Sequence, residues 1–169
     1  MNPALRSVLD AVALWRRGLS SAAAVVDAAV DALVAGVESP TFLRVAGLTR
    51  TEADVELAEL LPAALEELGV PVVEVTDPGH DVLVAAAMTT PFRNGEQQAR
   101  ALTGDVHRVF GHDCHPLVER LASLDDEFDL LDEGHGSSAE VVEHRVREAV
   151  TAVDGAAAEI YEPGERASA

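Results

Sequence analysis

"LVERLASLDDEFDLLD", residues 117–132, places an apolar side chain at alternating intervals of four and three positions. Side chains at this spacing share one face of an α-helix, and the pattern is typical of the seam between packed helices. The face comprises Leu117, Leu121, Leu124, Phe128 and Leu131. The stretch therefore predicts a helix that buries one side against other helices.

The N-terminal part of the chain shows three further helix patterns. Each run of apolar residues at helical spacing follows a residue type that caps helix N-termini and ends at a glycine. The runs extend from Asn2 to Gly18, from Ser20 or Ser21 to Gly36, and from Ser39 to Gly47. Near the other end of the chain, helices are predicted over residues 95–110, 117–132 and 138–153.

The run that follows Thr49 is expected to be interrupted. Thr49 and Glu52 fit a capping box, which predicts a helix start. Pro62 lies inside the periodic run that follows, and a proline in a helix interior removes a hydrogen bond and clashes with the preceding turn. We therefore expect a short helical turn over residues 50–54 and a separate helix near residues 56–68, kinked at the proline or beginning close to it.

Three stretches show weaker helix signals. Residues 69–75, "GVPVVEV", are the best strand candidate, but one strand cannot form a sheet, so an extended linker is expected. Residues 76–81, "TDPGHD", predict a turn from their Pro-Gly pair, and residues 82–92 predict a short helix. The tail over residues 155–169 has no apolar periodicity and is expected to fray.

These patterns predict an all-α fold. The chain has only four Phe, one Trp and one Tyr, so its core must consist mainly of Ala, Val and Leu, which suits closely packed helices. We expect a compact bundle of about six to eight short helices, or two small helical lobes. The expected divisions are an N-terminal lobe over residues 1–70, a connecting segment over 71–94, an acidic helical lobe over 95–153 and a flexible tail over 154–169.

The chain is strongly acidic. It carries 30 Asp and Glu against 12 basic residues, and its net charge is −18. Residues 51–169 hold most of that negative charge. Such a field disfavours direct binding to nucleic acid or an anionic membrane and speeds association with a basic protein. Solubility alone is the competing explanation.

The cellular location is inferred from what the sequence lacks. Its single cysteine, Cys114, excludes an internal disulfide framework. The sequence shows neither a signal peptide nor an apolar run of membrane-spanning length. We therefore expect a cytoplasmic protein with no membrane partner.

The outer side of the helix over 117–132 is the candidate binding site. No basic residue follows Asp125, Asp126 or Asp129 by three or four positions, and like charges at that spacing cost a helix about 0.2–0.5 kcal/mol per pair. An apolar side chain inside a ring of carboxylates is a common form of protein-binding surface. We predict that this surface comprises Glu119, Asp125, Asp126, Asp129, Leu130, Asp132 and Glu133. The alternative is a solvated face with one exposed leucine.

A metal site is the rival hypothesis. Residues 112–115, "HDCH", bring potential ligands close in sequence, and His107 lies nearby. A structural zinc site needs four ligands, usually in two pairs, and Pro116 biases His115 away from helical geometry. We therefore predict no metal and no cofactor. The alternative is a metal-binding module or metal-dependent enzyme that uses His107, His112, Cys114 and His115.

The sequence contains none of the common catalytic motifs considered next. The sequence contains no nucleophile elbow, no glycine-rich phosphate loop and no paired zinc-binding histidine motif. We predict no catalytic residue and a non-enzymatic protein.

Two stretches of the sequence resemble parts of known bacterial protein families. Residues 25–71 and residues 106–133 resemble the two halves of uncharacterised acidic helical proteins of actinobacteria, which imply a helical fold and no particular activity. The "LDDEFD" phrase of residues 124–129, followed by a helix, is also similar to small immunity proteins of the colicin or pyocin kind. That resemblance implies that acidic side chains neutralise a basic toxin.

The functional prediction follows from charge and geometry together. We expect a non-enzymatic acidic helical protein that binds a basic protein, in its sharpest form an immunity-like or antitoxin-like inhibitor. A scaffold subunit, whose acidic face only keeps an assembly in solution, is a further alternative.

Overall fold

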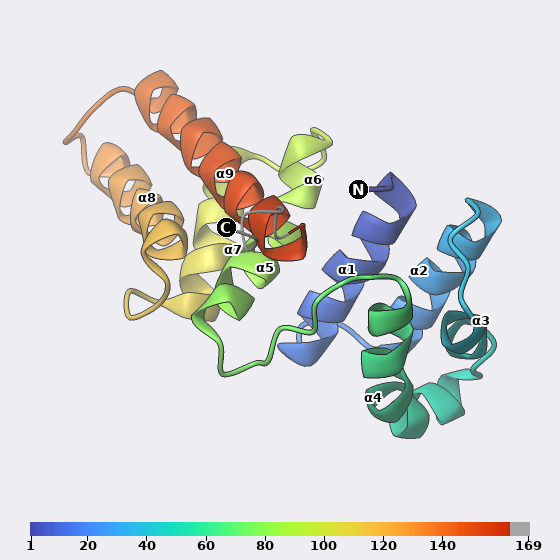
Figure 1. Ribbon diagram of the computed structural model, residues 1–169. Helices are drawn as coiled ribbons and strands as arrows, with labels where there is room; N and C mark the ends of the chain where they lie inside the picture. Colours follow the sequence, from blue (N-terminus) through green and yellow to red (C-terminus); the bar gives the residue numbers. More distant parts are fainter. Residues whose placement is uncertain (163–169) are drawn as a thin grey trace, which may run out of the picture. The chain divides into compact units, whose positions relative to one another are not determined.

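The computed structural model describes residues 1–162, and every regular element in that range is an α-helix (Figure 1). The helices are α1 (Pro3–Arg16), α2 (Ala22–Val34), α3 (Pro40–Ala46), α4 (Arg50–Glu67), α5 (Pro78–Met88), α6 (Thr90–Arg93), α7 (Ala99–Phe110), α8 (Pro116–Asp132) and α9 (Ala139–Tyr161). The predicted all-α fold is confirmed, with α6 no longer than a single turn.

The chain divides into two units. The first comprises Met1–Val75 together with the last two residues of α9, and the second comprises Thr76–Glu159. Helices α5 and α6 lie within residues 71–94, the predicted connecting segment, and both belong to the second unit. The physical reason is that α5 buries a continuous apolar run, residues 82–87, in a core.

The first unit is built by α1 to α4. Asn2, Ser21 and Ser39 cap three of these helices, because each side chain accepts a hydrogen bond from a backbone N–H of the first turn, as predicted. Helix α1 packs on α2, α3 packs on α4, and α2 contacts both α3 and α4. The fully buried side chains of this core include Leu9, Val25, Phe42, Val45 and Leu57.

Helix α4 differs from its prediction. It is one helix from Arg50 to Glu67 with Pro62 inside it, not a short turn followed by a second helix. The Thr49–Glu52 capping box forms as predicted. Ala53, Leu57, Leu61 and Ala64 are buried on both sides of the proline position, so packing of one continuous apolar face outweighs the hydrogen bond that proline cannot make.

Residues 70–74 form neither strand nor helix, in agreement with the predicted linker. Arg16, at the end of α1, holds this segment through two interactions. Its guanidinium donates to the backbone carbonyl of Val73 at 2.6 Å and pairs with the Glu74 carboxylate at 3.0 Å. The linker is therefore fixed to the first unit by a charge-assisted pair rather than by a strand partner.

The second unit contains two further corrections. The Pro-Gly pair predicted as a turn is the start of α5, because Asp77 accepts a hydrogen bond from the Gly79 N–H and proline fits the first position of a helix. Helix α9 does not end at residue 153 but continues to Tyr161. Val153, Ala157 and Tyr161 are buried at intervals of four positions, which is a helical spacing. The prediction of a flexible tail from residue 154 onward did not take this spacing into account. Residues 163–169 of that predicted tail lie outside the described residues.

Helix α8 packs on α7 and α5. Three of its predicted core residues, Leu121, Leu124 and Phe128, are buried, whereas Leu117 and Leu131 at its two ends are only partly covered. Val118 and Ala122 are fully buried beside them. The buried face is therefore wider than a single leucine seam, because α8 packs against more than one helix.

We expect Pro62→Ala to stabilise the protein. Alanine supplies the missing backbone N–H inside α4 without losing buried area, since Pro62 is exposed. The free energy of unfolding, measured by urea denaturation, should rise by about 1–3 kcal/mol. Pro40→Ala is the matched control, because Pro40 stands at the first position of α3, where the N–H has no helical partner. A lower stability of Pro62→Ala would contradict this account of α4.

Glu67 gives the first unit a predicted pH dependence. Its carboxylate at the end of α4 accepts hydrogen bonds from the Thr41 hydroxyl and the Thr41 backbone N–H at 2.7 and 2.8 Å, and these bonds lower the pKa of Glu67 below its usual 4.5. A carboxyl whose folded pKa is depressed stabilises the fold fully above its unfolded pKa and loses that effect as the pH falls through the folded pKa. Below about pH 4.5 the wild type should therefore lose stability more steeply than Glu67→Gln.

Thermal denaturation between pH 3 and pH 6, a range set around the ordinary carboxyl pKa of roughly 4.3, provides the measurement. Glu66→Gln is the control, because it removes the neighbouring exposed carboxylate and leaves the Thr41 contacts in place. Parallel curves for the wild type and Glu67→Gln would show that the hydrogen bonds to Thr41 do not contribute.

Candidate acidic binding surface

The predicted binding residues of α8 do not form one uniform surface. Among the predicted residues that form ion pairs, Asp129 and Asp132 have the most exposed side chains, at 66% and 68%. Leu130, which lies between them in the sequence, is 46% exposed. Glu133 is exposed at the end of the helix. We call Asp129, Leu130, Asp132 and Glu133 the acidic surface, because they are exposed neighbours at the C-terminal end of α8.

The other three predicted residues differ from the acidic surface in position, exposure or partners. Glu119 is partly buried in the first turn of α8, ten positions before Asp129, which corresponds to about 15 Å along a helix. Asp125 is turned inward, with a side chain only 22% exposed. Asp126 is half exposed at 51%, but its carboxylate faces two histidines.

The absence of a basic neighbour along α8 does not leave these carboxylates unpaired. One guanidinium nitrogen of Arg100, on α7, lies 2.9 Å from Asp129 and 2.8 Å from Asp132. The same side chain donates to the Phe128 carbonyl at 3.2 Å and lies 5.8 Å from the centre of the Phe128 ring. The expectation of unpaired charges is therefore wrong for Asp129, because its partner comes from another helix.

Three further residues, His107, His112 and Arg145, contact carboxylates of α8. The His107 Nδ1 lies 3.1 Å from an Asp125 carboxylate oxygen, and the His112 Nε2 lies 3.5 Å from Asp126. Arg145 of α9 pairs with Glu127.

A negative excess remains after these pairs. Residues 125–133 contain six carboxylates, and in the described part of the chain the arginines that pair with them are Arg100 and Arg145. Glu133 has no ion-pair partner within residues 1–162. Arg100 is itself 43% exposed, so its bonds to Asp129 and Asp132 compete with water and are individually weak. The acidic surface can therefore accept a second cation.

The spacing of residues on α7 explains how the two helices meet. Arg100, Gly104 and His107 recur at intervals of four and three and therefore share one stripe of α7. Arg100 contacts Asp129 and Asp132, while Gly104 and His107 face Asp125. Arg100 was not among the predicted site residues, although its spacing from Gly104 and His107 places all three on one face of a helix.

The predicted ligand set His107, His112, Cys114 and His115 comes together only in part. The rings of His107 and His112 lie 4.6 Å apart between their centres. His115 instead caps α8, because its Nδ1 accepts a hydrogen bond from the Leu117 N–H at 3.3 Å. The Cys114 sulfur lies 3.8 Å from the backbone carbonyl oxygens of Gly111 and His115.

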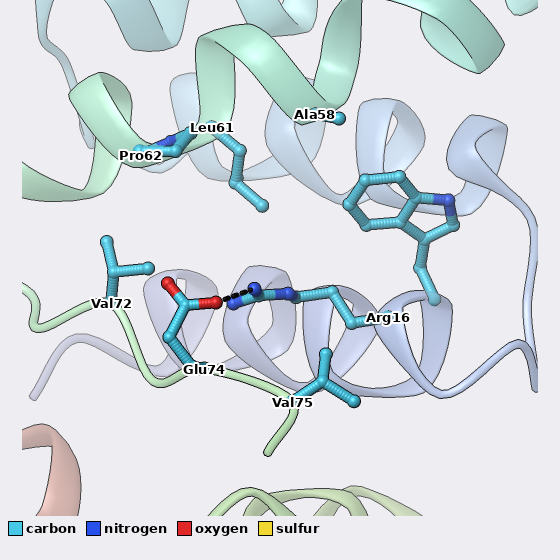
Figure 2. Close-up of a pocket in the computed structure, with 8 residues that line it drawn as sticks. Arg16, Ala58, Leu61, Pro62, Val72, Glu74 and Val75 are labelled. Atoms are coloured by element: carbon cyan, nitrogen blue, oxygen red, sulfur yellow. Dashed lines mark hydrogen bonds and ion pairs between the residues drawn. The ribbon is translucent and has the colours of Figure 1, made fainter. Parts of the chain in front are cut away.

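A hollow of about 390 Å³ opens in the first unit (Figure 2). Its walls come from α1, α4 and the linker, and its lining residues are Trp15, Arg16, Ala58, Leu61, Pro62, Val72, Glu74 and Val75. Figure 2 shows that Arg16 and Glu74 pair with each other inside it. The two charged side chains of the hollow therefore neutralise one another.

Comparison with protein-family models, with curated proteins and with solved structures found no match to this chain. None of the helices in residues 1–162 combines the length and the apolar character that a membrane crossing requires.

Arg100→Gln should lower stability slightly. Loss of the guanidinium leaves Asp129 and Asp132 facing each other without their shared partner and removes the hydrogen bond to the Phe128 carbonyl. The free energy of unfolding should fall by about 0.5–1 kcal/mol at low salt, and by less at high salt, where exposed charges are screened. Urea denaturation at two salt concentrations measures the difference.

Arg108→Gln is the matched control. Arg108 lies on the same helix, but its side chain is 75% exposed and pairs only locally, with Asp105. Its removal should leave stability nearly unchanged. Equal effects of the two variants would mean that Arg100 does not organise α8.

Proposed function

We propose that the protein is a non-enzymatic, cytoplasmic helical protein that binds a basic protein partner through the acidic surface of α8. A single observation supports the proposal. Leu130 is 46% exposed among three carboxylates, and within residues 1–162 the guanidinium that pairs with them, that of Arg100, is shared by two of the three.

The chemistry of this surface fits a cationic partner. Arginine or lysine side chains of a partner would pair with Glu133 and share Asp129 and Asp132 with Arg100. Covering Leu130 would exclude water from these pairs and strengthen them. The net charge of −18 would steer the encounter and make association faster at low ionic strength.

The sharpest form of the proposal is an immunity-like or antitoxin-like inhibitor. In that role the acidic surface would cover the basic active face of a toxin, and the complex would be catalytically silent. The resemblance of residues 124–129 to immunity proteins favours this form over a general binding role.

The test compares two matched triple variants. Leu130→Ala with Asp132→Asn and Glu133→Gln removes two charges and one exposed aliphatic side chain from α8. Asp27→Asn with Asp31→Asn and Val34→Ala does the same on α2, where both carboxylates are exposed and Val34 is 86% exposed. Both variants have the same net charge, so any difference between them reports location rather than total charge.

The partner is a basic protein that co-purifies with the chain from its native host and is then produced separately. Calorimetry at low and high salt should show that the α8 variant binds it more weakly by roughly tenfold or more, whereas the α2 variant binds like the wild type. Equal weakening by both variants would mean that binding depends on the total charge of the chain and not on this surface. Unchanged binding by the α8 variant would reject the surface. If the partner is a toxin, inhibition of its activity should be lost in parallel.

A further inference from the structure

The geometry points to a binding site for a divalent transition-metal ion of the zinc class, formed by His107, His112 and Asp126. Each residue offers one ligand atom, and the three atoms lie within 4.8 Å of one another. The ligands come from the end of α7, the following loop and the middle of α8. This set differs from the sequence-adjacent cluster, because Asp126 takes the place of Cys114 and His115.

Only small movements are needed to close the site. Ligand atoms around a zinc ion bound at about 2.0–2.2 Å stand about 3.4 Å apart. The His112 Nε2 already lies 3.5 Å from one Asp126 oxygen, and the His107 ligand atom lies within 4.8 Å of the other two ligand atoms. His112 and Asp126 are about half exposed, at 48% and 51%, so their side chains can rotate without disturbing the core.

Asp125 gives the site a second, independent feature. Metal-ligating histidines commonly donate their other ring N–H to a carboxylate, which fixes the tautomer and the orientation of the ring. The Asp125 carboxylate lies 3.1 Å from the His107 Nδ1, so a proton on that nitrogen leaves the lone pair of Nε2 for the metal. Asp125 is a positioning residue in this arrangement and not a ligand.

Gly104 allows Asp125 to take that position. A Cβ at Gly104 would stand 3.3 Å from an Asp125 carboxylate oxygen, so a side chain there would require that oxygen to shift by a few tenths of an ångström. Glycine in the middle of a helix costs roughly 0.5–1 kcal/mol relative to alanine. Its presence opposite Asp125 is consistent with a requirement for close approach.

The donor set selects the class of ion. Two imidazoles and one carboxylate suit zinc and neighbouring transition metals, whereas magnesium and calcium prefer oxygen ligands. Three protein ligands leave one coordination position to water. A bound ion would add two positive charges beside Asp126 and join α7, the loop and α8.

The experiment uses the full chain without a histidine tag, with Zn²⁺ as the probe in calorimetry and Co²⁺ in absorption spectroscopy. We expect one ion per chain and visible Co²⁺ bands of tetrahedral type, without the near-ultraviolet band of a thiolate ligand, because Cys114 is not in the set. His107→Ala and His112→Ala should each weaken Zn²⁺ binding by roughly tenfold or more. Asp125→Asn, which keeps all three ligands, should weaken it by about 10–100-fold.

Three controls isolate the site. His144→Ala removes an exposed histidine that pairs with Glu148 on α9, and Cys114→Ser removes the cysteine. The variant with Leu130→Ala, Asp132→Asn and Glu133→Gln removes the acidic surface but keeps every ligand. All three should bind Zn²⁺ like the wild type.

Several results would overturn the metal site. These are the absence of stoichiometric Zn²⁺ binding, unchanged affinity in His107→Ala and His112→Ala, or an equal loss in His144→Ala. Circular dichroism of each variant verifies that helicity is retained. His112 lies in an exposed loop, so its variant keeps the test valid even if changes on α7 disturb the fold.

Discussion

The stripe of Arg100, Gly104 and His107 on α7 determines where the carboxylates of α8 stand. Arg100 holds Asp129 and Asp132, Gly104 leaves space for Asp125, and His107 pairs with Asp125. Asp125, Asp126 and Asp129 have no basic residue three or four positions later in α8, so repulsion among them would weaken the helix. Pairing across the helix interface removes part of that penalty while the apolar face of α8 is buried.

This arrangement gives the carboxylates of α8 different chemical environments. Asp125 is largely covered and contacts His107, so its role in the proposed site is to orient the histidine ring. Asp126 faces His107 and His112 and suits a cation. Asp129, Asp132 and Glu133 are open to solvent beside Leu130 and suit a larger, basic partner. One helix therefore carries two candidate sites that do not share residues, and each can be removed without the other.

Local sequence signals predicted much of the fold. Capping residues at Asn2, Ser21 and Ser39 and the apolar period of α8 act over a few positions, and each predicted its helix correctly. The continuation of α4 through Pro62 was not predicted, because it depends on packing against other helices. Tertiary packing can outweigh a local helix-breaking signal, which only the assembled core reveals.

The candidate site was predictable only in part. The exposure of Leu130 and Asp129 follows from a helical wheel, and the structure agrees. The pairing of Arg100 with Asp129 joins residues 29 positions apart, and no periodicity within α8 contains that information. For the same reason the cluster "HDCH" does not indicate that Asp126, on the next helix, lies beside His107 and His112.

The central claim is that the acidic surface of α8, and not the acidity of the whole chain, binds a basic protein. Backbone amide shifts of the isotope-labelled protein, recorded by nuclear magnetic resonance during titration with the basic partner, test it most directly. The account predicts that the largest shifts cluster at residues 129–133 and at Arg100, with little change on α1 to α4. Shifts spread over exposed carboxylates throughout the chain, or centred on the first unit, would contradict it.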